Sequence, residues 1–305
     1  MHVLSIGNFD GVHEGHQALF ARAREVAVSD GSRGLVTAVT FDPLPRTVVA
    51  PGSGPPLIES IRERVRSLRA AGADHVEVLA VDRAFLEASP VAFLTDLVAR
   101  VSGKERVGGF VEGADFCFGK ARAGSLDTLR TFGLAEGMVV ESIETKRVTL
   151  ASGETVEARS STVRSLLEEG RVEDAACVLG RVPILEGRVV RGDARGRALG
   201  FPTANLDVEG RLLPREGVYA GVALLPNGER WATALSIGTK PTFKETPLVA
   251  EAHLIGWNGP IGEYDWVMNV ELTCWLRAQE RFDSIEALKA KIEEDCAAAV
   301  AHYRS

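Results

Sequence analysis

The hydrophobic and polar positions of the first 150 residues follow two alternating patterns. Leu19, Phe20, Ala23 and Val26 recur at the spacing of one helix face, which predicts a helix over residues 17–28. Further helices are predicted at 59–71 and 90–101, and strands at 2–6, 34–41, 75–80, 107–112 and 138–143. Strands that alternate with helices are typical of a parallel sheet covered by helices on both faces. Such a sheet binds its ligand beyond the carboxyl ends of the strands.

The pattern changes in the second part of the chain. An apolar stripe predicts a helix over 160–179, and short β-forming runs then follow, separated by turn sequences such as Pro226-Asn227-Gly228. Strands are predicted at 184–190, 217–225, 230–237, 248–255 and 266–276. Regularly spaced short strands favour a small antiparallel barrel, and an apolar stripe behind a serine cap predicts a final helix over 284–303. We therefore expect an α/β parallel-sheet domain over 1–182 and an antiparallel β-barrel domain with a C-terminal helix over 183–305.

Composition and charge narrow the classes of function. The 305 residues are 45% hydrophobic and 25% charged, which is ordinary for globular domains. The net charge is −7 and neither expected domain is basic, so no nucleic-acid partner is expected. The four cysteines form no CxxC pair, which favours free thiols in a reducing compartment over a zinc site or a disulfide frame. Because there is no signal-peptide pattern and no long apolar run, we expect a soluble cytoplasmic protein with no membrane partner. A monomer or a weak homo-oligomer is the expected assembly.

The first candidate site joins the first strand to the first helix. The segment GNFDGVHEGH carries glycines at 7, 11 and 15, which allow a sharp turn and a close approach to a ligand. The free N–H groups at the start of the next helix favour a phosphate there. His13 and His16 are three residues apart, so both can lie on one side of the first turn and stabilise charge that develops on a phosphate. A zinc pair and structural histidines are the alternatives, although zinc would need a third ligand.

GNFDGVHEGH resembles the signature of the HxGH nucleotidyltransferase superfamily, in the form used by bacterial FAD synthetase modules. Three further segments resemble that family in order: TFDPLPR from Thr40, with Leu44 where the family usually has His; GADFCFG from Gly113, on the flavin side; and SSTVR from Ser160, shifted so that Arg159 stands at a Ser position. The resemblance implies a Rossmann-like nucleotidyltransferase fold with His13 and His16 as catalytic residues. It implies ATP or phosphate contacts from Gly7, Asn8, Phe9, Asp10, Gly11, Gly15, Ser160, Ser161 and Arg164. It implies flavin contacts from Asp42, Pro43, Asp115, Phe116 and Phe118.

The second candidate site is a glycine-spaced basic loop over 192–200 that runs into Phe201-Pro202-Thr203-Ala204-Asn205. Pro202 favours extended geometry before it, and in an extended chain Thr203 and Asn205 point to one face. A hydroxyl and an amide oxygen suit Mg²⁺ with nucleotide phosphates. Taken alone, the loop could also be a solvated loop and the Thr-x-Asn pair a turn.

GRALGFPTAN strongly resembles the riboflavin kinase signature, and IGTKPTF at 237–243 and Glu251-Ala252-His253 resemble later segments of that family. Tyr264-Asp265 departs from the Tyr-Gly that the family often has. The resemblance implies that Glu251 is the general base on a flavin ribityl hydroxyl. It implies ATP phosphate contacts from Gly192, Arg195, Gly196, Arg197 and Gly200. It also implies a Mg²⁺ site at Thr203 and Asn205 and flavin contacts from Arg277 and Phe282.

The resemblance covers nearly the whole chain, with the motifs in the expected order. It implies a bacterial bifunctional riboflavin kinase/FAD synthetase. The C-terminal domain would phosphorylate riboflavin with ATP and Mg²⁺ to FMN, and the N-terminal domain would adenylylate FMN to FAD and release pyrophosphate. One alternative is another nucleotidyltransferase, acting on nicotinate mononucleotide or phosphopantetheine, which would leave GFPTAN and Glu251 unused. The other is a flavin-sensing regulator with degenerate sites, which Leu44 and the shifted SSTVR segment slightly support.

Overall fold

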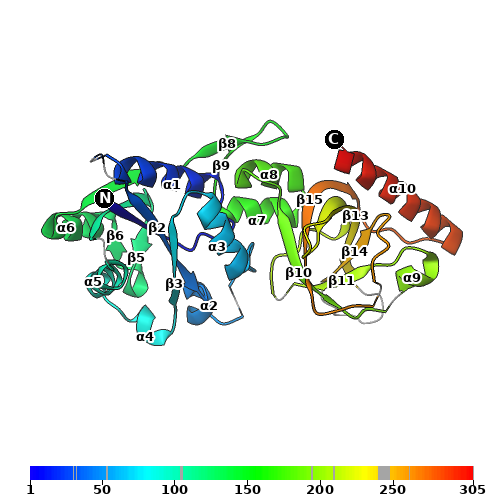
Figure 1. The fold of residues 1–305 in the computed structure, drawn as a ribbon, viewed down its shortest axis with the longest axis horizontal. Helices are drawn as coiled ribbons and strands as arrows, with labels where there is room; N and C mark the ends of the chain where they lie inside the picture. The colour runs from blue at the N-terminus through cyan, green and yellow to red at the C-terminus, as the bar shows by residue number, and fades with distance from the viewer. Residues whose placement is uncertain are drawn as a thin grey trace. The chain divides into compact units, whose positions relative to one another are not determined.

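The computed structural model describes residues 1–29, 31, 33–52, 54–103, 106–193, 195–208, 210–239, 248–260 and 262–304. By its internal contacts the chain divides into two compact units (Figure 1). The first unit comprises Met1–Val148 and Val156–Ser160, and the second comprises Thr149–Thr155 and Ser161–Ser305. The domain boundary between 182 and 183 stays a prediction.

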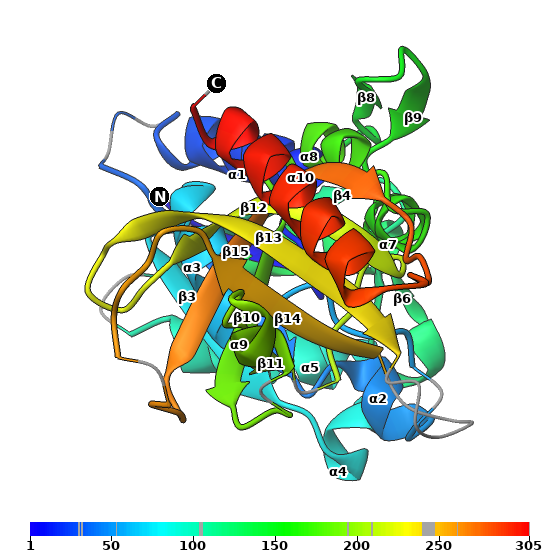
Figure 2. The same ribbon diagram turned by 90° about the vertical axis from the view of Figure 1, so that its right-hand side faces the viewer.

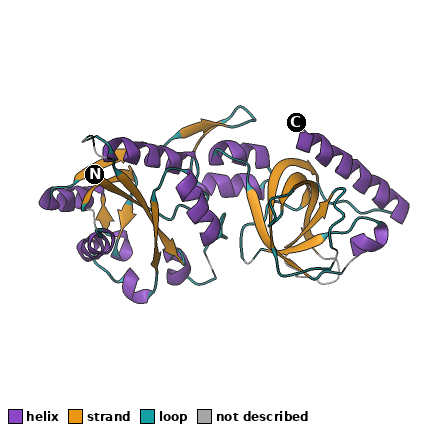
Figure 3. Cartoon of the chain, viewed as in Figure 1, coloured by secondary structure: helices purple, strands orange, loops and turns teal. Residues whose placement is uncertain are grey.

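The first unit is built on a five-stranded parallel sheet with the strand order β3-β2-β1-β4-β7. The strands are β1 (His2–Ile6), β2 (Leu35–Asp42), β3 (His75–Ala80), β4 (Val107–Gly113) and β7 (Val139–Ile143). The main helices are α1 (Glu14–Ala27), α3 (Ile61–Ala70), α5 (Pro90–Val101) and α6 (Leu126–Glu136). Figure 3 shows the strands lying between helices, so the predicted fold class is confirmed for this unit.

Both faces of this sheet are buried. Val3 packs with Phe20 of α1 on one face, and Leu4 packs with Leu94 of α5 and Leu129 of α6 on the other. Parallel strands that are buried on both faces have continuous apolar sequences, as the central strands do here. The chain leaves the central strands β1 and β4 in opposite directions along the sheet, so their carboxyl ends form the switch point where such folds bind ligands.

The first unit also contains the small elements α2 (Pro45–Val49), α4 (Arg83–Leu86), β5 (Cys117–Phe118), η1 (Lys120–Arg122) and β6 (Gly124–Ser125). The paired strands β8 (Arg147–Thr149) and β9 (Thr155–Glu157) are shared between the two units, because Thr149 and Thr155 belong to the second. Helix α1 begins at Glu14, three residues earlier than the predicted start at residue 17. Gly15 lowers helix propensity there, but a Cβ at this position would lie 2.9 Å from the carbonyl oxygen of Ala158. Gly15 therefore lies within the helix because a side chain would not fit at this position, and it does not mark a helix end.

The second unit contains a closed antiparallel barrel with the strand order β10-β11-β14-β13-β12-β15. The strands are β10 (Ile184–Val190), β11 (Ala204–Asp207), β12 (Gly217–Leu224), β13 (Arg230–Thr239), β14 (Leu248–Leu254) and β15 (Val267–Arg277). Helix α10 (Ile285–Arg304) packs across β12 and β13 (Figure 2). Its N-terminus is capped by the Ser284 hydroxyl, which accepts a hydrogen bond from the N–H of Ala287 at 3.1 Å. The predicted barrel and C-terminal helix are confirmed.

The single helix predicted over 160–179 is wrong. The structure has two helices, α7 (Ser160–Glu168) and α8 (Val172–Leu179). Gly170 lies between them with φ 81°, and a Cβ there would lie 2.8 Å from the Trp275 ring. The prediction also missed α9 (Arg195–Leu199), in the basic loop.

Candidate functional sites

The GNFDG loop after β1 is bent by unusual backbone angles. Phe9 and Val12 have φ values of 47° and 35°, which non-glycine residues rarely adopt, and Gly11 has φ 88°. The loop is fixed to β2, because Gly7 N donates to the Val39 carbonyl at 3.0 Å and the Thr40 hydroxyl donates to the Asn8 carbonyl at 3.1 Å. Such strain persists only where surrounding contacts hold it, and it is often found at functional sites.

The structure brings His13 and His16 together at the start of α1. Their rings stack with centroids 3.6 Å apart, and the Phe9 ring packs edge-on against His16 at 5.0 Å. His13 is 6% exposed and is the N-cap residue of α1. A Cβ at Gly15 would lie 3.1 Å from the His13 ring, so this glycine leaves room for the stack. Among the described residues no group of three His, Cys, Asp or Glu could hold a metal, so the zinc alternative has no support there.

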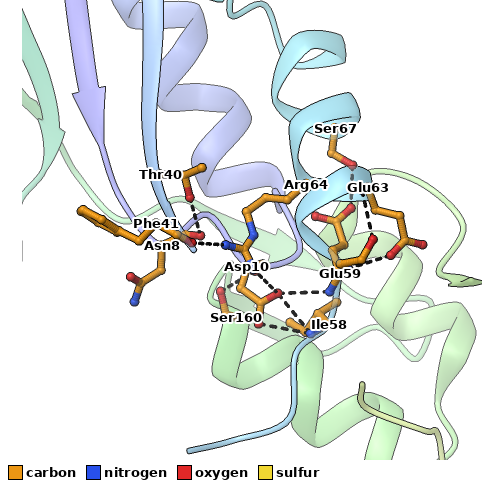
Figure 4. A network of polar contacts seen from close by, with 11 residues as sticks. Asn8, Asp10, Thr40, Phe41, Ile58, Glu59, Glu63, Arg64, Ser67 and Ser160 are labelled. Atoms are coloured by element: carbon orange, nitrogen blue, oxygen red, sulfur yellow. Dashed lines mark hydrogen bonds and ion pairs between the residues drawn. The ribbon is translucent and has the colours of Figure 1, made fainter. Parts of the chain in front are cut away.

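Asp10 lies at the centre of a polar network (Figure 4). Its carboxylate is 2% exposed and accepts hydrogen bonds from the N–H groups of Ile58, at 3.1 and 3.2 Å, and Glu59, at 3.1 Å. Its carbonyl accepts a hydrogen bond from the Ser160 hydroxyl at 2.7 Å. The Asp10 carboxylate therefore has partners inside the protein and shapes the loop. Ser161 and Arg164 follow Ser160 along α7, in the part of the chain that belongs to the second unit.

The residues expected on the flavin side fall into two environments. The Arg159 guanidinium donates to the Asp115 carboxylate at 2.7 Å, and this hydrogen bond lowers the pKa of Asp115 below its ordinary value. Phe116 and Phe118 stack with centroids 5.2 Å apart, and Phe118 is buried in the core. Arg159, which stands where the family has Ser, therefore ties the loop around Asp115 to the chain just before α7.

The segment after β2 is exposed at Asp42 and Pro43, which are joined by a cis peptide bond. Leu44 is the N-cap residue of α2 and packs against the apolar cluster around Phe93. The leucine that replaces the family's usual histidine is thus a packing residue here.

Sequence reasoning missed a buried acid at the switch point. Glu112, near the end of β4, is 1% exposed and accepts a hydrogen bond from Ile6 N at 2.8 Å. Burial raises the pKa of Glu112 well above its ordinary value, and the hydrogen bond from Ile6 only partly opposes this shift. The backbone pairing of β1 with β4 ends at Leu4 and Phe110. Beyond that point the Glu112 side chain, in place of a backbone carbonyl, binds the Ile6 N–H group.

In the barrel, the basic loop packs closely against the FPTAN segment. A Cβ at Gly192 would lie 2.1 Å from Asn205 Nδ2, and one at Gly196 would lie 2.3 Å from the Phe201 carbonyl oxygen. Gly200 has φ 94°, which favours glycine. Ala194 lies outside the described residues, and α9 begins at the backbone of Arg195. The loop thus reaches the FPTAN segment only because these positions lack side chains.

A pocket in the barrel unit collects several of the predicted kinase residues. Gly192, Arg197, Thr203 and Asn205 line it. Apolar and aromatic residues complete the lining, among them Val190, Leu254, Trp257, Tyr264, Trp266 and Met268. A mostly apolar lining with a few polar groups is usual for a pocket that binds a small molecule.

Asn205 and Glu251 lie directly opposite each other on the paired strands β11 and β14. Asn205 is 6% exposed, and its Oδ1 atom is buried with no hydrogen bond from any described residue. Glu251 is half-buried, and Thr203 precedes Asn205 by two residues. An amide oxygen, a hydroxyl and a carboxylate are the hard donors that Mg²⁺ prefers, so these residues fit that ion.

The other residues expected at the barrel site stay predictions, and the structure describes only some of them. The Arg277 guanidinium donates to the Asp295 carboxylate of α10 at 2.7 to 3.1 Å and lies 5.7 Å from the Phe282 ring centroid, so Arg277 and Phe282 are close but Arg277 is engaged. Residues 240–243 of the IGTKPTF segment lie outside the described residues. Sequence reasoning gave no role to His253, whose Nδ1 lies 2.8 Å from the Pro202 carbonyl oxygen and whose ring packs against Phe201.

Comparisons with known proteins match the two regions of the chain that contain the candidate sites. A family model described as FAD synthetase matches residues 1–156, and one described as riboflavin kinase matches residues 179–303. The bifunctional riboflavin kinase/FMN adenylyltransferase of Pseudomonas fluorescens is 35% identical over 298 residues, which cover 97% of this chain and 91% of that protein. The enzyme of the same description from Escherichia coli strain K12 is 35% identical, covering 96% of this chain and 90% of that protein. A solved structure described as a macrolide-efflux protein from Streptococcus pneumoniae is 26% identical, with a TM-score of 0.79. The match covers 96% of this chain and 92% of that chain.

The chain belongs to the family of bifunctional riboflavin kinase/FMN adenylyltransferases. It is a kinase and a nucleotidyltransferase of FMN and FAD synthesis, with the FAD synthetase region first and the riboflavin kinase region second. The description of the pneumococcal structure as an efflux protein applies to that protein. Among the helices in the described ranges, none combines the length and apolar character needed to cross a bilayer.

Proposed function

We propose that Glu251, Thr203 and Asn205 carry the kinase reaction in the barrel. The observation that supports this most strongly is the buried Asn205 Oδ1, which lacks a hydrogen bond from the described residues and faces the same side of the barrel wall as Glu251. A buried polar atom without a partner is costly to a folded protein. A cation held between Asn205, Thr203 and the nucleotide phosphates would satisfy it.

In this proposal the chain positions the reactants and moves one proton. Gly192, Gly196 and Arg197 hold the ATP phosphates, with Arg195 and Gly200 in the same loop. Glu251 accepts the proton of the ribityl hydroxyl as its oxygen attacks the γ-phosphorus, and the bond from that phosphorus to ADP breaks. Bound Mg²⁺ supplies screening of the phosphate charge.

For the first unit we propose that His13 and His16 donate hydrogen bonds to the ATP phosphates during adenylyl transfer. A phosphate oxygen of FMN attacks the α-phosphorus, and pyrophosphate leaves. FMN phosphate is already a nucleophile, so the histidines need not act as bases. The stacked rings at the N-terminus of α1 place two donors beside the free N–H groups of the helix, where a phosphate is favoured. Phosphate contacts from Ser160, Ser161 and Arg164, and flavin contacts from Asp42, Pro43, Asp115 and Phe116, stay predictions, as do the cellular location and the oligomeric state.

The Mg²⁺ assignment can be tested on Asn205. Asn205→Leu removes the buried oxygen at similar volume, whereas Asn205→Asp keeps an oxygen in place. We expect the Mg²⁺ concentration that gives half-maximal FMN formation to rise at least about tenfold in the Leu variant, because one hard ligand is lost. The Asp variant should stay within a few-fold of wild type.

Asn227→Ala, in an exposed turn, is the matched control for this titration. An unchanged Mg²⁺ dependence in a folded Asn205→Leu variant would contradict the proposed ligand role.

A further inference from the structure

Arg64, in the first half of α3, is an unusual residue for the interior. It is 1% exposed, although arginine is almost never fully buried unless it is paired. Its Nη1 atom donates to the Phe41 carbonyl at 3.0 Å, and its Nη2 atom lies 3.9 Å from Oδ1 of the buried Asp10. The guanidinium therefore contacts two segments of the chain (Figure 4).

These two segments are the loop after β1 and the end of β2, which flank the candidate adenylyl-transfer site. Asp10 belongs to the GNFDG loop after β1, and Phe41 lies next to the end of β2, just before Asp42 and Pro43. Because β1 and β2 are parallel neighbours, their carboxyl ends lie at the same edge of the sheet. Arg64 thus joins, from a helix, the GNFDG loop and the end of β2 at the edge where the nucleotide is expected.

The rest of the network strengthens this link. The Asp10 carboxylate also accepts the N–H groups of Ile58 and Glu59, which precede α3. Glu59 in turn accepts a hydrogen bond from the Ser67 hydroxyl at 2.5 Å, one helical turn beyond Arg64. Helix α3 is thereby attached to the GNFDG loop through both the backbone that precedes it and the Arg64 guanidinium.

We propose that Arg64 is a positioning residue for adenylyl transfer, which holds the GNFDG loop against the end of β2 through Asp10 and the Phe41 carbonyl. Phe9 in this loop and Val12 directly after it have strained conformations, and such backbone relaxes when the contacts that hold it are removed. His13 follows Asp10 by three residues, so relaxation of the loop would displace the histidine pair. Misplacement of a reacting group by about 1 Å can reduce a rate about 100-fold. The proposal rests on the assignment of adenylyl transfer to the first unit.

The test compares Arg64→Met, which keeps the length but removes the charge and donors, with Arg64→Lys and with Arg69→Met. Arg69 is exposed on the same helix and is the matched control. We expect Arg64→Met to lower the single-turnover rate of FMN adenylylation by about 10- to 100-fold. The stoichiometry and Kd of FMN binding should stay close to wild type. Arg64→Lys should recover part of the rate, since an ammonium keeps the charge but not the planar pair of donors.

A double-mutant cycle separates positioning from a loss of folded protein. If Arg64 acts through Asp10, the variant with both Arg64→Met and Asp10→Asn should lose little more rate than the worse single variant. Riboflavin phosphorylation, carried by the other region of the same chain, should be unchanged and reports the amount of intact enzyme. A reduced binding stoichiometry with a normal rate per bound FMN would overturn the proposal, as would a wild-type rate in Arg64→Met. Failure of the wild-type chain to form FAD from FMN would instead contradict the assignment on which the proposal rests.

Discussion

The two candidate sites are held together in opposite ways. In the first unit the loop that carries the site is fixed by a buried network of charged and polar groups around Asp10 and Arg64. In the barrel the basic loop is held by close packing at Gly192 and Gly196, and Asn205 keeps a buried oxygen without a partner among the described residues. The first site is therefore shaped mainly by a buried polar network, and the second mainly by close backbone packing beside the buried Asn205 Oδ1 atom. Substitutions at some distance should therefore matter more in the first unit, and direct loss of a ligand atom more in the second.

The sharpest test of this separation is Glu251→Gln. Removal of a general base typically slows a reaction by about 10² to 10⁴-fold, so FMN formation from riboflavin should fall by at least about 100-fold. Conversion of FMN to FAD should change less than about twofold, because the histidine pair belongs to the other unit. Both rates can be followed by chromatography of the flavins.

Glu286→Gln, in the exposed first turn of α10, serves as the control. Equal loss of both activities in Glu251→Gln would contradict the assignment of the two reactions to separate sites.

His16→Ala is the corresponding test of the adenylyl-transfer site. Loss of one preorganised donor to a developing charge costs about 10² to 10³-fold in rate, so adenylylation of FMN should fall by about 100-fold while riboflavin phosphorylation is retained. His75→Ala, at the exposed start of β3, is the matched control. Retention of the wild-type FAD rate in His16→Ala would refute the role proposed for the stacked pair.

The smallest expected effect concerns Glu112 and the pH dependence of stability. Below the ordinary carboxyl pKa, near 4.5, both folded and unfolded chains carry the proton. Above it the unfolded chain releases the proton while the folded chain retains it up to its raised pKa. The stability contributed by this proton is therefore present at low pH and is lost as pH rises, by at most about 1.4 kcal/mol per pH unit. Glu112→Gln should remove this decline.

Hydrogen exchange of peptides from β1 and β4, measured from pH 5 to neutrality, checks this prediction. The four tryptophans, at 231, 257, 266 and 275, all belong to the second unit, so their fluorescence is an internal control that should not change. Glu136→Gln, with an exposed side chain on α6, is the matched variant. Identical pH dependence of exchange in wild type and Glu112→Gln would contradict the assignment of the shift to this residue.

The sequence predicted the five strands of the parallel sheet, five of the six barrel strands and helices α1, α3, α5 and α10, because their apolar spacing is set by which face is buried. It missed the short barrel strand β11 and helix α6. The helix expected over 160–179 was wrong because Gly170 has to accommodate the Trp275 ring, a contact between residues far apart in the chain. Motifs located both candidate sites, since the glycines and polar residues that shape them are close together in sequence.

The supporting residues could not be predicted in the same way. Arg64 lies in an amphipathic helix that also carries exposed arginines at 62, 66 and 69, and sequence spacing does not show which guanidinium meets Asp10. Glu112 lies in an apolar strand. Its carboxyl group is explained by the end of the pairing between β1 and β4, where it binds Ile6 N, and the sequence does not show where that pairing ends. Both depend on contacts between distant segments.

If one chain acts on one flavin at two separate ATP sites in succession, a chromatographic time course of riboflavin, ATP and Mg²⁺ with the wild-type chain will show it. We expect FMN to accumulate first, FAD to follow after a lag, and pyrophosphate to be released only with FAD. Formation of FAD without intermediate FMN, or failure to form FMN by a folded chain, would contradict it.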